Sequence, residues 1–214
     1  MDFIDPKLEA YVAAHSGEEP AILQNLNRDT YANVLMPRML SGHVQGRILA
    51  MFCQMIAPKR ILELGTFTGY SAICLAEGLK PDGLLYTIDI NEELEEMAKT
   101  YFEKAGISSR TKQFIGNAIE IIPKLDEEFD LVFIDADKLN YSKYYDLVFD
   151  KLKIGGYIIA DNILWSGKVL TEDPKDKDLE AIKIYNQKVK NDSRVSCVVL
   201  PLRDGISIVR KNSN

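Results

Sequence analysis

From residue 60 onward, short apolar runs alternate with longer segments that have helical spacing. The apolar runs predict strands over 61–65, 84–90, 112–115, 131–135, 157–161, 195–200 and 206–210. The segments between them predict helices over 70–79, 92–105, 118–125, 142–152 and 179–190. Such alternation is typical of parallel βαβ units, and Asp204-Gly205 between the last two strands predicts a hairpin. We therefore expect an α/β fold whose sheet is parallel apart from one antiparallel strand.

The segment before residue 58 has no strand pattern. Residues 6–33 have helical spacing interrupted at Gly17 and Pro20, and a further apolar face from Val44 to Ile56 ends before Pro58. We expect an N-terminal helical cap over 1–57 and a sheet core over 58–211. A chain of 214 residues suits one domain, so we predict a single domain over 1–214.

Composition and charge narrow the class of protein. The chain is 46% hydrophobic and 27% charged, as in ordinary globular proteins, and its net charge of −6 argues against a polyanionic partner such as nucleic acid. A helix needs about 18 to 20 uninterrupted apolar residues to cross a membrane, and no apolar run in the chain is that long. The acidic start Met1-Asp2-Phe3-Ile4-Asp5 lacks the basic region of a signal peptide. We expect a cytoplasmic protein without membrane contact.

Cysteine and histidine usage makes a zinc site improbable. Cys53, Cys74 and Cys197 are far apart and have apolar neighbours, so we expect reduced thiols in the core. His15 and His43 are the only histidines, and neither lies near a cysteine pair.

The first predicted strand ends in a glycine turn, Gly65 to Gly69, that leads into a helix. This arrangement points backbone N–H groups and a helix N-terminus at a ligand above the strand. A dinucleotide fingerprint needs G-x-G-x-x-G, whereas here Phe67 stands between two glycines. Glu63 would repel a diphosphate but attract a cationic group. A nucleoside with a cationic tail, such as S-adenosylmethionine, fits this turn; the alternative is an ordinary turn without ligand.

The next two predicted strands also end in polar or small residues. Asp89 closes the second strand, where a carboxylate can accept hydrogen bonds from ribose hydroxyls; its alternative role is the N-cap of the following helix. Gly116-Asn117-Ala118 follows the third strand and can lie beside an adenine.

Two later strands end in acids that we expect to meet. Asp135 ends one of them, and Asp161-Asn162 ends the next. Neighbouring strand ends lie about 5 Å apart, so two carboxylates and an amide oxygen would converge. Three oxygen ligands favour Mg²⁺, or else Mn²⁺ or Ca²⁺. The alternative is a pair of capping acids with an Asn turn.

Two further residues follow these acids. Lys138 would lie over the same point, where a neighbouring dication and sulfonium disfavour its ammonium form and suit it to general base catalysis; a surface lysine is the alternative. Trp165, the only tryptophan, can form an aromatic wall for a flat substrate or pack in the core.

Taken together, these residues resemble the cation-dependent O-methyltransferases, which include catechol and caffeoyl-CoA O-methyltransferases; the caffeoyl-CoA branch and its bacterial relatives are more similar. The resemblance covers about residues 36 to 211. It rests on five segments, Glu63–Ser71, Ile88–Asn91, Phe133–Tyr141, Asp161–Gly167 and Leu200–Gly205. It implies a Rossmann-like class I methyltransferase fold, with a seven-stranded, mostly parallel sheet, one antiparallel strand and helices on both faces, and usually a homodimer.

The resemblance also implies roles for individual residues. It implies that S-adenosylmethionine is contacted by Ser41, Glu63, Gly65, Thr66, Ser71, Asp89, Ala118 and Asp135. It implies that Asp135, Asp161 and Asn162 hold the metal, that Lys138 is the base, and that Met39 and Trp165 line the substrate pocket. Asp89 matches the caffeoyl-CoA branch, whereas the animal catechol enzyme has a Glu there. Ala136 and Asp137 replace bulkier residues of that enzyme, so the resemblance does not determine the shape of the acceptor pocket.

We therefore expect a divalent-cation-dependent O-methyltransferase that methylates a hydroxyl of a catechol-like phenolic small molecule with S-adenosylmethionine as donor. One alternative keeps the chemistry and makes a hydroxylated uridine in tRNA the acceptor. A second alternative is a protein that binds S-adenosylmethionine without turnover.

Overall fold

The computed structural model describes residues 5–214, so the predicted acidic start at residues 1–4 lies outside the described residues. The strands are β1 (Arg60–Leu64), β2 (Leu84–Asp89), β3 (Thr111–Ile115), β4 (Phe129–Ile134), β5 (Leu152–Ala160), β6 (Val195–Leu200) and β7 (Ile206–Lys211). They form a seven-stranded sheet in the order β3-β2-β1-β4-β5-β7-β6. β7 runs antiparallel to both β5 and β6, whereas β1–β2, β2–β3 and β4–β5 are parallel pairs. The predicted fold class is confirmed.

The α-helices of the described chain are α1 (Pro6–Ala14), α2 (Ala21–Asn33), α3 (His43–Ile56), α4 (Tyr70–Ala76), α5 (Glu95–Lys104), α6 (Ala118–Ile121), α7 (Tyr141–Phe149) and α8 (Lys177–Asn191). Short 3₁₀ turns cover Pro37–Met39, Glu92–Leu94, Ser108–Arg110, Ile122–Lys124, Lys138–Asn140 and Trp165–Leu170. Each predicted helix is present, but α4, α6 and α7 end three to four residues earlier than their apolar spacing predicts. The chain comprises two compact units, residues 5–117 and residues 118–214. The prediction of a single domain stays a prediction.

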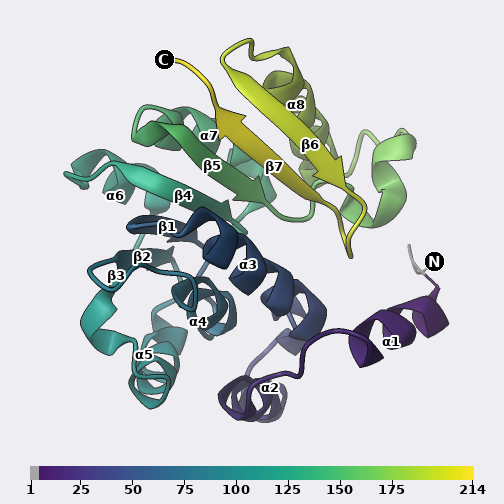
Figure 1. The fold of residues 1–214 in the computed structure, drawn as a ribbon. Coiled ribbons are helices and arrows are strands. Elements are labelled where there is room, and N and C mark those ends of the chain that lie inside the picture. Colours follow the sequence, from purple (N-terminus) through teal and green to yellow (C-terminus); the bar gives the residue numbers. More distant parts are fainter. Residues whose placement is uncertain (1–4) are drawn as a thin grey trace. The chain divides into compact units, whose positions relative to one another are not determined.

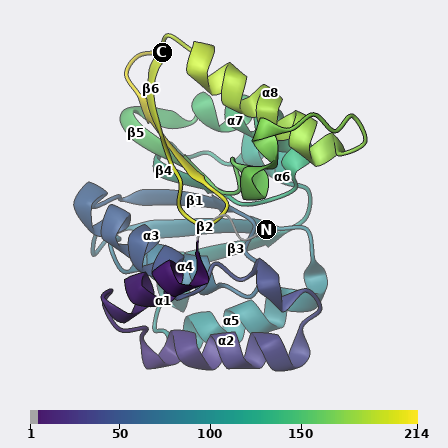
Figure 2. The same cartoon turned by 90° about the vertical axis from the view of Figure 1, so that its right-hand side faces the viewer.

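In the unit of residues 5–117, side-chain contacts join the helices. The guanidinium of Arg47 in α3 holds the carboxylate of Glu77, just after α4, through contacts of 3.0 and 2.6 Å. The Tyr101 hydroxyl of α5 donates to Asp29 of α2, and Figure 2 shows these two helices side by side. These contacts fix the helices around the parallel strands β1 to β3.

In the unit of residues 118–214, α7 and α8 cover the same side of the sheet (Figure 1 and Figure 2). Their contact is aromatic, because Tyr141 and Tyr145 of α7 meet Tyr185 of α8 edge to face, with ring centroids 5.5 and 6.2 Å apart. All three rings are fully buried. This packing fixes the helix that follows Lys138 against the sheet.

Strand β5 begins earlier than predicted, at Leu152. Its pairing with β4 shifts register, since Phe129 pairs with Leu152 whereas Leu131 pairs with Tyr157. The extra residues of β5 form a bulge in which Gly155 has φ +85°. Residues 152–156, which contain a lysine and two glycines, lack the apolar pattern of a strand. The sequence therefore predicts a strand only from residue 157.

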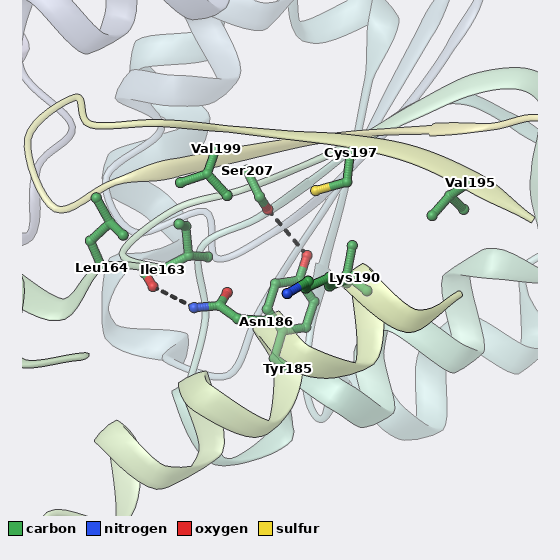
Figure 3. A pocket seen from close by; sticks show the side chains of 10 residues that line it. Ile163, Leu164, Tyr185, Asn186, Lys190, Val195, Cys197, Val199 and Ser207 are labelled. Atoms are coloured by element: carbon green, nitrogen blue, oxygen red, sulfur yellow. Dashed lines mark hydrogen bonds between the residues drawn. The ribbon is translucent and has the colours of Figure 1, made fainter. Parts of the chain in front are cut away.

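The edge strand β6 is exposed on both faces. Val198 and Val199 are 51% and 46% exposed, and Cys197 is exposed as well, so the prediction of a core thiol is wrong for Cys197 and confirmed for Cys53 and Cys74. A groove of about 360 Å³ lies between β6 and α8. Figure 3 shows the side chains that line it. It is lined by Ile163, Leu164, Tyr185, Asn186, Val189, Lys190, Val195, Cys197, Val199 and Ser207. None of these is a predicted site residue.

Across residues 5–214, every helix is too short or too polar to cross a lipid bilayer.

Candidate active site

The turn between β1 and α4 has the strand-turn-helix form that its glycines predict. Gly65 donates from its N–H to the carbonyl of Ile88 at 2.9 Å and so extends the pairing with β2. Gly65 and Gly69 have φ +98° and +92°, and Phe67 between them also has a positive φ of 49°. Glycine meets the first two backbone requirements without strain, whereas Phe67 needs support from its neighbours.

Asp89 supplies that support. Its Oδ2 accepts a hydrogen bond from the Phe67 N–H at 2.7 Å, and its Oδ1 accepts one from the Asn91 N–H at 2.8 Å. Asn91, not Asp89, caps the following helical turn, because the Asn91 side chain accepts from the Glu93 N–H at 3.0 Å. The alternative N-cap reading of Asp89 is therefore wrong. Each carboxylate oxygen has a second lone pair, so contact with ribose hydroxyls stays a prediction.

Glu63 is fully buried near the end of β1, where Thr87 contacts it directly and Thr66 contacts Thr87. The Thr87 hydroxyl of β2 donates to Oε2 of Glu63 at 2.6 Å, and the Thr66 hydroxyl bonds to that of Thr87. Sequence reasoning missed Thr87; a polar residue inside an otherwise apolar strand was the available signal. The other two predicted cofactor residues of this unit, Ser41 and Ser71, are also buried, with 7% and 6% exposure.

The predicted metal ligands follow the carboxyl ends of the paired strands β4 and β5. Ile134 pairs with Ala160, so Asp135 and Asp161 are the next residues on two adjacent strands. The Asp161 N–H donates to the Ile134 carbonyl at 3.0 Å, and Asp161 is only 3% exposed. Asn162 follows with φ +59°, and its N–H donates to Oδ1 of Asp161 at 2.7 Å. The predicted adjacency of the strand ends is therefore present.

The amide of Asn162 has a defined direction. Its Nδ2 faces Oδ2 of Asp204 at 3.4 Å, whereas its Oδ1 accepts no hydrogen bond from any residue of the described chain. Residues 5–214 contain no cluster of three or more His, Cys, Asp or Glu side chains that suits a metal ion. The predicted set differs from such clusters because it has two carboxylates and one amide oxygen. Three oxygen donors with one unused amide oxygen fit a hard divalent cation.

Lys138 is held between a predicted metal ligand and a tyrosine. Its Nζ donates to Oδ1 of Asp135 at 3.0 Å and to the hydroxyl of Tyr141 at 2.8 Å. The Lys138 side chain is 12% exposed, so the alternative of a solvated surface lysine is wrong for its position. Its role as a base stays a prediction.

Tyr141 is a site residue that sequence reasoning missed. Its ring is fully buried, and its hydroxyl donates to the carbonyl of Asp161 at 3.1 Å while it accepts from Lys138. Burial raises the pKa of Tyr141, and the charges of Asp135 and Asp161 raise it further, so the phenol stays neutral. Its spacing of three residues from Lys138 on the same helical turn was the available signal.

The remaining predicted residues belong to three different elements. Trp165 has its indole N–H bonded to Oδ2 of Asp176 at 3.1 Å, at the start of α8. Met39 is 60% exposed in the turn before α3. Ala118 is the buried first residue of α6. Their contacts with cofactor or substrate stay predictions.

The order of the strands and the antiparallel β7 define a class I methyltransferase fold. The family model described as O-methyltransferase matches residues 13–212. Caffeoyl-CoA O-methyltransferase 1 of Nicotiana tabacum is 35% identical over 189 residues, which cover 82% of this chain and 78% of the relative.

Two solved structures are similar over nearly the whole chain. The O-methyltransferase TomG from Streptomyces achromogenes, in complex with SAM, is 26% identical with a TM-score of 0.89 and covers 97% of this chain and 96% of its own. The O-methyltransferase from Bacillus cereus, in complex with SAH, is 26% identical with a TM-score of 0.88 and covers 96% and 97%.

The chain therefore belongs to the O-methyltransferase family. The prediction of an S-adenosylmethionine-dependent O-methyltransferase is confirmed, and an enzyme is favoured over a non-catalytic binding protein.

Proposed function

We propose that this enzyme methylates one hydroxyl of a catechol-like phenolic small molecule and that it needs a divalent cation to do so. The observation that carries the proposal is the group at the ends of β4 and β5. Two carboxylates on adjacent strands, an amide oxygen and a held lysine lie there in one unit. The similarity to a relative named caffeoyl-CoA O-methyltransferase supports a phenolic acceptor.

The methyl donor of this family of enzymes is S-adenosylmethionine, which TomG holds in its solved structure. In the present chain, buried Glu63 is suited to the cationic end of this donor, because Thr87 fixes the carboxylate by a hydrogen bond of 2.6 Å. Asp89 stabilises the glycine turn and has lone pairs left for ribose hydroxyls. The full proposed set is Ser41, Glu63, Gly65, Thr66, Ser71, Asp89, Ala118 and Asp135.

The proposed cation ligands are Asp135, Asp161 and Asn162, with Mg²⁺ the preferred ion and Mn²⁺ or Ca²⁺ the alternatives. A divalent cation at these oxygens supplies Lewis acidity that makes a nearby hydroxyl of the acceptor more acidic. Lys138, as the neutral amine, would accept the proton of that hydroxyl at Nζ and become an ammonium. Its contacts with Asp135 and Tyr141 keep the amine in place for this step. Met39 and Trp165 are proposed to contact the acceptor ring.

Alignment and exclusion of water are the main contributions that we assign to the protein. Methyl transfer from a sulfonium to a phenolate neutralises two opposite charges, so orientation matters more than charge stabilisation. Effective alignment contributes up to about 7 to 11 kcal/mol in well-oriented systems. A homodimer and a cytoplasmic location, both expected from the sequence, stay predictions.

The test is a methyl-transfer assay with caffeate and other catechols, with Mg²⁺ and with excess chelator. We expect methylated product only with the cation, while S-adenosylmethionine binding measured by calorimetry persists in chelator. Asp161→Ala should abolish the activity even when Mg²⁺ is present, whereas Asp146→Asn, at an exposed carboxylate of α7, is the matched control and should keep both the activity and its dependence on the cation. Full catechol methylation in excess chelator would overturn the role of the cation.

A further inference from the structure

The turn between β6 and β7, residues 201–205, is part of the sequence resemblance but has no role in the proposed site. In the structure it lies against the segment that begins with Asn162. The Ile163 N–H donates to the Gly205 carbonyl at 3.1 Å, and the Leu164 N–H donates to the Asp204 carbonyl at 2.8 Å. The turn and the segment 162–164 are thus joined through their backbones.

The approach is close enough to require a glycine. Gly205 has φ +87°, and a Cβ atom built there would lie 2.3 Å from Cγ of Leu164. On its other side, the segment is held by α8, because the Asn186 amide donates to the Ile163 carbonyl at 2.8 Å (Figure 3). The backbone after Asn162 is therefore fixed from two directions.

The side chain of Asp204 adds two polar contacts, one with Asn162 at the start of this segment and one with Ser166 just beyond it. Its Oδ1 accepts from the Ser166 hydroxyl at 2.7 Å, and its Oδ2 faces Nδ2 of Asn162 at 3.4 Å. A carboxylate can only accept hydrogen bonds, whereas an amide has a donor end and an acceptor end. If the Asn162 amide turned over, its oxygen would face the oxygen of Asp204 and the two would repel each other.

We propose that Asp204 is a positioning residue that selects the direction of the Asn162 amide, so that Oδ1 is presented for a divalent cation. The inference rests on the proposed function, because it assigns a purpose to the amide only if Asn162 is a cation ligand. It adds a residue that makes no contact with the cation itself. Groups that orient a ligand typically change metal affinity by about 10- to 100-fold when removed.

The test is a titration of the full chain with Mn²⁺, followed by electron paramagnetic resonance, which measures the dissociation constant without turnover. Asp204→Asn keeps the size of the side chain but can both donate and accept hydrogen bonds. Either direction of the Asn162 amide could then pair with it, so Oδ1 would no longer be presented to the cation in preference to Nδ2. We expect binding to weaken by about tenfold. The melting temperature and the dissociation constant for S-adenosylmethionine should stay at the wild-type values, which a merely structural role would not predict.

Two variants separate orientation from charge. Asp204→Glu keeps the charge but moves the carboxylate by one methylene, and it should also weaken Mn²⁺ binding. Asp146→Asn removes one charge from an exposed position of the same unit and should bind Mn²⁺ as the wild type does. Ser166→Ala removes the hydrogen bond to Oδ1 of Asp204 and so lets the carboxylate move. If Asp204→Asn lowers the melting temperature, this second variant should still weaken Mn²⁺ binding.

The outcomes distinguish this inference from the proposed function. Wild-type affinity in Asp204→Asn, or in Asp204→Glu alone, would overturn the positioning role while the cation site stands. A wild-type chain that binds Mn²⁺ no better than Asp161→Ala would overturn the cation site, and the role of Asp204 would fall with it.

Discussion

Lys138 illustrates what single residues contribute to this enzyme. Its amine lies 3.0 Å from Asp135 and 2.8 Å from the Tyr141 hydroxyl, so two contacts restrict a side chain that is usually mobile. The sequence predicted Lys138 and Asp135 as neighbours because Lys138 follows Asp135 by three positions. It did not predict Tyr141, since the direction of a tyrosine depends on the packing of α7 against α8.

At this scale we predict that Lys138→Ala lowers kcat by about 10² to 10⁴, the usual contribution of a general base. The dissociation constant for S-adenosylmethionine should change little, because the amine is assigned to the acceptor. Single-turnover methyl transfer to a catechol measures the first effect and calorimetry the second. Lys143→Ala, an exposed lysine of α7, is the matched control. A kcat within twofold of the wild type would exclude Lys138 as the base.

At the scale of elements, Asp192 joins α8 to its neighbours. It follows α8 directly, and its carboxylate accepts from Nε and Nη2 of Arg194 at 2.9 and 2.7 Å and from the Tyr145 hydroxyl of α7 at 2.9 Å. The guanidinium also lies over the ring of Phe149 at 3.8 Å. Side-chain hydrogen bonds from Arg194 are the main cause that lowers the pKa of Asp192.

We therefore predict that Asp192→Asn destabilises the chain near neutral pH by roughly 1.5 to 3 kcal/mol, as expected for a lost charged hydrogen bond. Because the pKa is lower in the folded than in the unfolded state, the stabilisation is present above about pH 4 and is lost as pH falls further. Denaturant unfolding at several pH values should show the difference from wild type shrink on acidification. The exposed pair of Asp146 with Lys188 should contribute about 0 to 1 kcal/mol, so Asp146→Asn is the control. A difference that does not depend on pH would contradict the assignment.

At the scale of the whole molecule, the net charge of −6 bears on the acceptor. Binding to RNA depends on Lys and Arg side chains that neutralise phosphates. A chain with a net negative charge gains little binding free energy from this electrostatic attraction. We predict no shift of tRNA mobility by the enzyme at about 50 mM salt and no methyl transfer to tRNA. Methylated uridine in tRNA, measured by mass spectrometry, would favour the tRNA alternative over a phenolic acceptor.

The alternation of apolar strands with helical segments determined the fold class, because burial of both faces of a parallel sheet leaves a strong pattern in a sequence. The same pattern identified the strand ends, and thereby Glu63, Asp89, Asp135 and Asp161 as candidates. Only the tertiary structure revealed the contacts of Thr87, Tyr141 and Asp204, since these residues act through side-chain directions and through partners up to 42 residues away. The bulge of β5 and the exposure of Cys197 likewise depend on pairing with neighbouring strands, a property that no local stretch of sequence contains.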